Sequence, residues 1–165
     1  MDFTNRDREI LSKLYPPFQK MAENFLQYCW NKELNVHLSQ GLRTWEEQNE
    51  LLEKCVSRAI GGMSYHNYGI AFDIVFDNNK EKDGVQDPYV GNWELAANIG
   101  HRCGLKPGFF WTSFQDKPHY QANIETGIAY LRNTFVKGGM VAVWDLLDTI
   151  EKEAFIIPPS GFKIE

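Results

Sequence analysis

The most constraining feature of this sequence is an acidic residue inside its most strand-like apolar run, residues 70–76 (Ile-Ala-Phe-Asp-Ile-Val-Phe). Successive side chains of a β-strand point to opposite faces, so Phe72, Ile74 and Phe76 share one face and Asp73 lies on the other. Both faces carry apolar neighbours, and we therefore expect the Asp73 carboxylate to be at least partly buried. A buried carboxylate without a partner costs several kcal/mol. A metal ion, an arginine or a set of backbone amides must compensate it.

Around this run, the hydrophobic spacing predicts one α+β domain. A helical pattern begins after Thr4, the expected N-cap, and Pro16-Pro17 divides it into two helices. Thr44 and Glu47 form the pattern of a capping box, for a helix that runs to about residue 55. The other expected elements are a strand within residues 35–42, a polar loop over 77–88, a helix over 93–103 closed by Gly104, an extended aromatic segment over 109–121, and helices near 128–136 and 141–155.

The composition excludes several classes of protein. Of the 165 residues, 43% are hydrophobic and 24% are charged, as in a globular domain with one core. The net charge of −5 and the scattered lysines and arginines predict no nucleic-acid partner and no anionic membrane partner. Cys29, Cys55 and Cys103 are odd in number and far apart, which predicts buried free thiols and neither disulfides nor a thiolate metal site.

Two histidines stand in unusual local settings and could be partners for Asp73. His66 follows a turn-prone approach to the strand, and His119 follows Pro118, which fixes the local backbone. Two imidazoles and one carboxylate are a typical ligand set for catalytic zinc, which keeps a fourth position for water. The residues alone leave the alternatives open, because a histidine is more often a core or surface residue and an aspartate is more often paired or solvated.

Three blocks of sequence carry a resemblance to a known family. Residues 64–74 (SYHNYGIAFDI) resemble the S-x-H-x-x-G-x-A-x-D signature of zinc peptidoglycan peptidases, the family of D-alanyl-D-alanine carboxypeptidases and L-alanyl-D-glutamate endopeptidases. Residues 111–121 (WTSFQDKPHYQ) are similar to the endopeptidase pattern W-x-x-F-x-D-x-P-H-F-Q, and residues 41–49 resemble the preceding G-x-R-T-x-x-E-Q. The blocks occur in family order, and the likeness extends from about residue 11 to residue 136. It is closer to the L-alanyl-D-glutamate branch.

The resemblance implies a fold, a metal and a reaction. The fold would be a small antiparallel sheet flanked by helices, as in hedgehog-like and DD-peptidase-like zinc peptidases. His66, Asp73 and His119 would bind one Zn²⁺ per chain, and Asp116 would act as the general base. The substrate would be a peptidoglycan stem peptide, cleaved at the L-alanyl-D-glutamate bond.

Arg43, Gln48 and Ser64 are implied to contact substrate or to lie near the metal. The first two would meet polar or carboxylate groups of the stem peptide, to which a guanidinium fork is suited. Without the resemblance, Arg43 could cap its helix, Gln48 could be solvated and Asp116 could be a turn residue. Ser64 is not expected to be a nucleophile, because the sequence around it has no G-x-S-x-G elbow.

Four other residues are expected to be structural. Trp111 and Phe114 are aromatic and are predicted to belong to the core, and His37 and His101 match no ligand position of the family. The segment 52–60 is shorter than the substrate loop of related sequences and has a pattern compatible with helix, and residues 106–111 depart from the family's W-G-G-x-W. Both departures concern specificity more than metal chemistry.

The sequence predicts a catalytic domain over residues 1–137 and a helical extension over 138–165 packed on the same domain. The alternatives are a D-alanyl-D-alanine carboxypeptidase or dipeptidase, and a non-catalytic zinc-stabilised wall-binding module of a phage or injection particle, whose components would then be partners.

Residues 1–8 are charged and lack the apolar centre of a signal peptide. We therefore expect synthesis in the cytoplasm, with access to the cell wall through a holin, a phage tail or host lysis.

Overall fold

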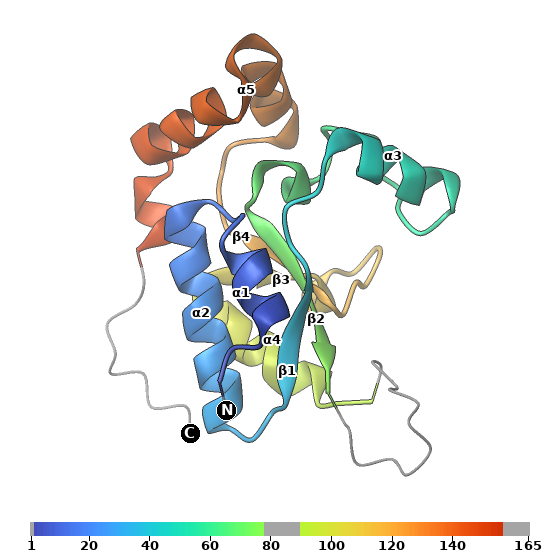
Figure 1. Cartoon of the computed structure of the whole chain (residues 1–165), viewed down its shortest axis with the longest axis vertical. Coiled ribbons are helices and arrows are strands. Elements are labelled where there is room, and N and C mark those ends of the chain that lie inside the picture. Colours follow the sequence, from blue (N-terminus) through green and yellow to red (C-terminus); the bar gives the residue numbers. More distant parts are fainter. Residues whose placement is uncertain (1, 78–89, 157–165) are drawn as a thin grey trace.

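The computed structural model describes residues 2–77 and 90–156, and within them it contains a four-stranded antiparallel sheet. The sheet has the order β1-β2-β4-β3, and helices flank it (Figure 1). The predicted α+β class with a small antiparallel sheet is confirmed. The strands are β1 (Val36–Gln40), β2 (Ala71–Phe76), β3 (Leu105–Pro107) and β4 (His119–Ala122). The α-helices are α1 (Asn5–Leu11), α2 (Pro16–Asn31), α3 (Trp45–Glu53), α4 (Trp93–Arg102) and α5 (Ile128–Ile150).

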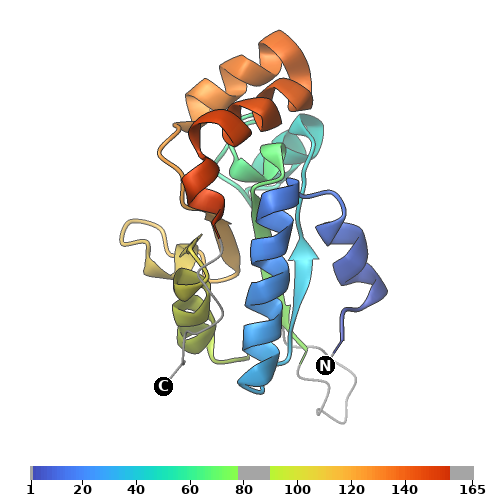
Figure 2. The same ribbon diagram turned by 90° about the vertical axis from the view of Figure 1, so that its left-hand side faces the viewer.

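The core lies between one face of the sheet and α2, which runs along it (Figure 2). The ring centroid of Phe72 in β2 lies 5.7 Å from that of Phe18 and 5.6 Å from that of Phe25, both in α2. On the neighbouring strand, the ring of Tyr120 stacks on Phe72 at 5.5 Å. Because side chains alternate along a strand, Asp73 and His119 are turned to the other face of the sheet. The alternation of side chains along β2 therefore places the core residues on one face of the sheet and the candidate metal ligands on the other.

The predicted helix starts are confirmed. Thr4 and Asp7 form a capping box at the start of α1, and Thr44 and Glu47 form one at the start of α3. Helix α2 begins at Pro16, where the missing proline N–H needs no intrahelical partner. In α4, the last turn is followed by Gly104 at a φ of 82°, a left-handed conformation that favours glycine.

Helix α3 is shorter than the sequence predicted, and one thiol lies elsewhere than expected. The helix ends at Glu53, and Cys55 takes a φ of 56°, which turns the chain away from the helix axis. Residues 54–60 are therefore not helical.

Cys29 and Cys103 are buried free thiols, as predicted, whereas Cys55 is exposed. The prediction of a buried thiol was wrong there, because it rested on the usual burial of free cysteines, whereas the turn at Cys55 exposes this thiol.

The aromatic segment 109–121 is only partly extended. A short 3₁₀ helix, η2 (Gly108–Phe110), is followed by a loop, and the strand β4 begins at His119. Phe114 is 45% exposed, so its assignment to the core was wrong, and Trp111 is half-buried. The predicted polar loop lies outside the described residues from position 78 onward.

The last helix has two arms, because Gly139 interrupts α5 with a φ of 69° and a ψ of −162°. The two helices predicted from the sequence are the two arms, and the second ends at Ile150. Val143 and Leu147 of the second arm are buried, and Trp144 Nε1 donates a hydrogen bond to the Tyr68 carbonyl at 3.0 Å. A 3₁₀ helix, η3 (Lys152–Phe155), follows. Among the described residues, no helix combines the length and apolar character needed to cross a membrane.

Candidate metal centre and catalytic cleft

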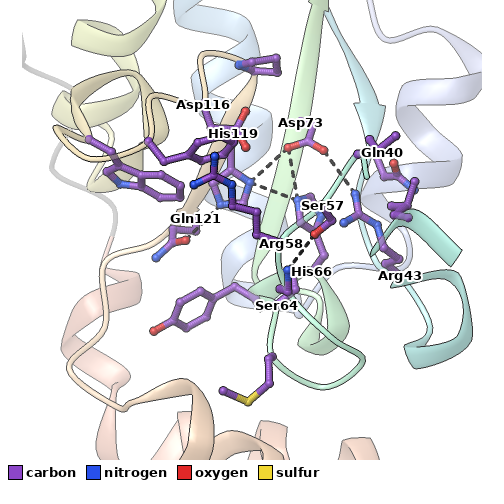
Figure 3. A pocket seen from close by; sticks show the side chains of 18 residues that line it. Gln40, Arg43, Ser57, Arg58, Ser64, His66, Asp73, Asp116, His119 and Gln121 are labelled. Carbon is purple, nitrogen blue, oxygen red and sulfur yellow. Dashed lines mark hydrogen bonds and ion pairs between the residues drawn. The ribbon is translucent and has the colours of Figure 1, made fainter. Parts of the chain in front are cut away.

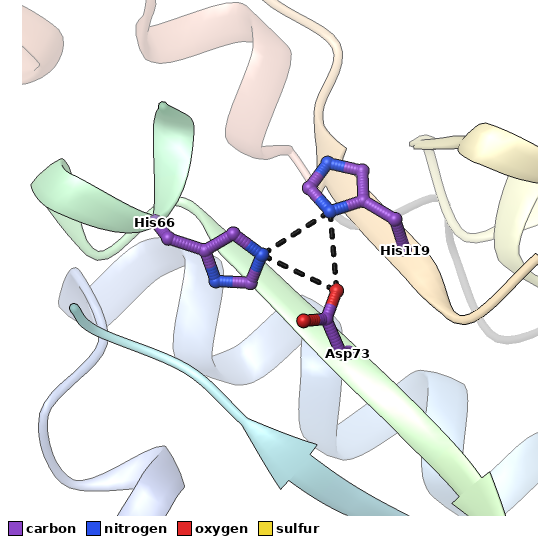
Figure 4. Close-up of side chains that lie close together, drawn as sticks. All are labelled: His66, Asp73 and His119. Atoms are coloured by element: carbon purple, nitrogen blue, oxygen red, sulfur yellow. Dashed lines mark hydrogen bonds and ion pairs between the residues drawn. The ribbon is translucent and has the colours of Figure 1, made fainter. Parts of the chain in front are cut away.

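The sheet register brings two of the candidate ligands together. Asp73 of β2 pairs directly with His119 of β4, although 46 residues separate them in the sequence. On its other side, Asp73 pairs with Gln40 after a register shift in β1. Two adjacent strands of one sheet thus place a carboxylate and an imidazole side by side (Figure 4).

The third candidate ligand comes from a short 3₁₀ helix, η1 (Tyr65–Tyr68), which precedes β2. His66 is buried in this helix, and its backbone carbonyl accepts a hydrogen bond from the Arg43 N–H at 3.0 Å. Asn67 holds the turn from both ends, because its Nδ2 donates to the carbonyls of Arg43 and Thr44 and its Oδ1 accepts from the Gly62 N–H. The sequence analysis missed Asn67, although it stands inside the matched motif.

The three ligand atoms form a nearly equilateral triangle. His66 Nε2 lies 3.2 Å from His119 Nδ1, and each of these nitrogens lies 3.2 Å from Asp73 Oδ1. Tetrahedral zinc with bonds of about 2.0–2.2 Å places its ligand atoms about 3.3–3.6 Å apart. The triangle in Figure 4, with sides of 3.2 Å, is therefore close to the size of a tetrahedral zinc site.

The hydrogen bonds around the histidines fix which nitrogen of each ring faces the others. His66 Nδ1 lies 2.7 Å from the Gly41 carbonyl, and His119 Nε2 lies 3.0 Å from Gln121 Oε1. Both contacts are with acceptors, so each of these nitrogens carries the proton in a neutral imidazole and the other nitrogen presents a lone pair. Two lone pairs and the Asp73 carboxylate oxygen then converge without a donor, which is the arrangement a cation stabilises. The donor set fits a metal ion.

The electrostatics of Asp73 favour its ionised form. Burial alone would raise the pKa of Asp73, but the adjacent His66 and His119 hold that pKa well below its usual range. The carboxylate is therefore ionised and available as a ligand.

Arg43 and Gln48 lie behind the metal triangle. Arg43 Nη2 is 3.5 Å from Asp73 Oδ2, and Arg43 Nη1 donates to Gln48 Oε1 at 2.8 Å. Gln48 is fully buried, and its Nε2 donates to Ser57 Oγ and to the Ala59 carbonyl. The side-chain amide of Gln48 is therefore occupied in holding Arg43 and the following loop in place. It is not placed to contact a substrate directly, contrary to what the sequence had suggested. A buried amide with donors and acceptors on both sides has no signature in a single sequence.

Asp116 stands at the edge of the same cleft, in the loop before β4. Its N–H donates to the Gly108 carbonyl at 3.0 Å, and its carbonyl accepts from the His119 N–H at 3.2 Å. Burial raises the pKa of the Asp116 carboxyl. The nearby Asp73 adds to this rise, and His119 acts against it. A Cβ on residue 108 would lie 2.5 Å from the Asp116 carbonyl oxygen, so the glycine at this position allows the loop to approach.

The metal triangle opens into a cleft of about 460 Å³ (Figure 3). Ser64, predicted to lie near the metal, lines it and is half-buried, and Trp111 and Phe114 line it as well. His37 lies away from the cleft and contacts the buried Asp7 at 2.8 Å. The side chains that line the cleft come from Gln40, Arg43, Leu51, Val56, Ser57, Arg58, Ala59, Met63, Ser64, Tyr65, His66, Asp73, Trp111, Phe114, Asp116, Pro118, His119 and Gln121.

Comparisons with known proteins agree with the geometry. A family model described as D-alanyl-D-alanine carboxypeptidase matches residues 58–122, the segment that contains the metal triangle and Asp116. The peptidoglycan L-alanyl-D-glutamate endopeptidase CwlK of Bacillus subtilis (strain 168) is 32% identical over 132 residues, which cover 70% of this chain and 77% of CwlK. The fold is similar to that of the L-Ala D-Glu endopeptidase ChiX of Serratia marcescens, with a TM-score of 0.54 and 23% identity over 73% of this chain and 89% of ChiX.

The predicted resemblance is thereby confirmed. It rests on the coverage of CwlK, on the fold shared with ChiX and on a family model that spans the candidate ligands. This chain belongs to the peptidase family whose model is described as D-alanyl-D-alanine carboxypeptidase and which includes peptidoglycan L-alanyl-D-glutamate endopeptidases.

Proposed function

We propose that this protein is a zinc-dependent peptidase that hydrolyses the L-alanyl-D-glutamate bond of peptidoglycan stem peptides. The observation that carries the proposal is the triangle of His66, Asp73 and His119, with Asp116 lining the same cleft. The names of the relatives CwlK and ChiX support the choice of bond. A full ligand set beside a retained carboxylate disfavours a module that only binds the wall.

The metal proposed for the site is one zinc ion per chain, held by His66 Nε2, His119 Nδ1 and an Asp73 oxygen. When bound, zinc polarises a carbonyl and lowers the pKa of a coordinated water towards about 7. The Gly41 carbonyl and Gln121 keep the two imidazoles in the orientation that presents their lone pairs.

The protein side chains supply the proton transfers and the orientation of the peptide. Asp116 would accept a proton from the attacking water and deliver it to the nitrogen of the leaving amine. Arg43 lines the cleft, and its buried Nε has no hydrogen-bond partner among the described residues. Arg43, whose guanidinium lies beside Asp73 in the cleft wall, would contact the bound peptide.

A second candidate reaction is removal of the terminal D-alanine. The description of the matching family model favours it. The same metal site and the same base would serve both reactions, so the two differ in which peptide bond the cleft places at the metal.

Mass spectrometry of peptidoglycan fragments after incubation with the zinc-loaded protein tests the proposal. Cleavage between L-alanine and D-glutamate that a chelator abolishes is the expected result. Release of terminal D-alanine alone would assign the protein to the carboxypeptidase reaction. Absence of cleavage on several peptidoglycan types, with zinc bound, would contradict both.

A further inference from the structure

Arg58 is an exposed cation in the wall of the catalytic cleft, and the mechanism above leaves it unused. It belongs to the loop between α3 and η1, and it lines the cleft together with the metal triangle. Its guanidinium carbon lies 4.3 Å from the ring centroid of Phe114, which stands in the loop before β4. Arg58 therefore reaches across the cleft between two loops that are far apart in the sequence (Figure 3).

The residues on both sides of Arg58 are held in place by Gln48. The fully buried amide of Gln48 donates to Ser57 Oγ at 2.6 Å and to the Ala59 carbonyl at 2.9 Å. Ser57 Oγ in turn accepts the Ala59 N–H at 3.1 Å. The same glutamine accepts a hydrogen bond from Arg43. The buried side chain of Gln48 thus connects Arg43 to the loop that carries Arg58.

The two arginines differ in how much of their hydrogen-bonding capacity is used. The side chain of Arg43 is 8% exposed and forms an ion pair with Asp73. Arg58 is exposed and has an aromatic partner, and no described carboxylate pairs with it. An arginine stacked on a ring keeps its edge N–H groups free, and these form a planar fork that matches a carboxylate. Arg58 is therefore preorganised for an anionic group that enters the cleft.

The proposed substrate provides such a group. A glutamate joined to alanine through its amino group has two carboxyl groups, and the peptide continues through only one of them. The other lies beside the scissile bond as a free carboxylate or as an amide. We propose that Arg58 is a specificity-determining residue that selects stem peptides whose glutamyl carboxylate is free over those in which it is amidated. This inference rests on the proposed function.

The test compares two synthetic stem peptides that differ only in this group, one with D-glutamate and one with D-isoglutamine. For the zinc-loaded protein, we expect kcat/KM to be about 10-fold higher for the free acid, because a charge-assisted bidentate contact is lost in the amide. Arg58→Gln should bring the ratio close to one through a loss on the free acid alone. Arg58→Lys should keep part of the preference, since it retains the charge and loses the fork.

Two further variants separate the contact from a general effect of charge. Arg102→Gln removes the same charge from an exposed position on α4, outside the cleft, and should keep the wild-type ratio. Phe114→Leu should lower the ratio, because it removes the ring on which Arg58 is stacked. Equal cleavage of both peptides by the wild type, or an unchanged ratio in Arg58→Gln, would overturn the inference.

Failure of the proposed function would give a different result. If neither peptide is cleaved, binding of the two peptides to zinc-loaded Asp116→Asn protein and to the same protein with Arg58→Gln is measured by calorimetry. Weaker binding of the free acid in the double variant, with unchanged binding of the amide, would support the role of Arg58 by itself. Equal binding of the free acid by both proteins would contradict it.

Discussion

Asp73 meets two requirements with one carboxylate. Its Oδ1 completes the triangle with His66 and His119, while its Oδ2 faces Arg43 at 3.5 Å. A buried carboxylate without partners would destabilise the fold. The site residues His66, His119 and Arg43 therefore also offset the cost of burying Asp73 in an apolar strand. Stability and function are linked at this one position.

At Asp116, chemistry can be separated from metal binding. Asp116→Asn keeps the size of the side chain and removes its basicity, and the residue is not part of the metal triangle. We expect unchanged zinc content and a turnover lower by roughly 10²–10⁴-fold, the usual contribution of a general base. Zinc is measured by atomic absorption and turnover on an alanyl-glutamyl stem peptide. Near-normal turnover would remove Asp116 from the mechanism.

A second carboxylate, which does not line the cleft, predicts a pH dependence of stability. Asp7 is fully buried and accepts hydrogen bonds from Thr4 and from the Leu38 N–H, and it contacts His37. Burial would raise its pKa, but these hydrogen bonds outweigh burial and lower the pKa below the ordinary 3.8. A carboxyl with a lowered folded-state pKa stabilises the fold above its unfolded pKa, and this contribution is lost as the pH falls below about 3.8.

The comparison of wild type with Asp7→Asn tests this expectation. Urea unfolding of the metal-free proteins at pH 7 should show a lower free energy of unfolding for the variant by about 1.5–3 kcal/mol, the range for hydrogen bonds to a charged group. At pH 3 the difference should be smaller, because the wild-type carboxyl begins to lose its charge. A difference of equal size at both pH values would show that Asp7 does not act through its charge.

Sequence reasoning at this scale found the three residues of the triangle and missed the residues that hold them in place. The motif spacing identified His66, Asp73 and His119, which the structure brings within 3.2 Å of one another. Gln121 lies two residues after His119 on the same strand, and Gln48 meets Ser57 and Ala59 in the loop after α3. The residue types alone do not show which of these amides is buried or which partner it contacts. The exposed ring of Phe114 was assigned to the core because aromatic character alone does not distinguish a cleft wall from an interior.

Among the elements, those with local signals were predicted best. Capping boxes and prolines act within a few residues, so the starts of α1, α2 and α3 could be found from the sequence. The end of α3 could not, because the chain turns at Cys55 through a positive φ that non-glycine residues seldom adopt. That turn is supported by tertiary contacts of the following loop with Gln48.

The kink of α5 makes a prediction about glycine. Gly139 combines a φ of 69° with a ψ of −162°, a region that residues with a Cβ avoid. Gly139→Ala should therefore lower the free energy of unfolding by about 1–3 kcal/mol, although no atom lies within 4 Å of the added Cβ. Gly127→Ala is the matched control, since that site is equally open and has an ordinary φ of −67°. Thermal unfolding of both variants measures the difference, and equal costs would mean that backbone strain is not the cause.

For the whole molecule, the metal site should act as a cross-link between segments. His66, Asp73 and His119 come from η1, β2 and β4, so an ion bound to all three ties these elements together in the folded state only. A ligand at about 100 times its Kd stabilises a protein by about 2.7 kcal/mol. For a chain of this length, we expect a chelator to lower the Tm of the zinc-loaded protein by about 5–10 °C.

His119→Ala provides the control for that experiment. The variant lacks one ligand, so its Tm should be lower than that of the zinc-loaded wild type and should not respond to the chelator. Scanning calorimetry with and without chelator measures both proteins. A chelator effect of equal size in the variant would place the bound metal somewhere other than the triangle.

The direct pairing of Asp73 with His119 has a consequence for quality control during folding. If β4 docked one residue out of step with β2, His119 would turn to the opposite side of the sheet and the triangle would be lost. If the triangle binds a metal ion as proposed, binding would depend on correct strand register, because only a molecule with this register presents all three side chains together. In a purified sample, the ratio of tightly bound metal to chain counts the fraction of molecules whose sheet has been assembled correctly.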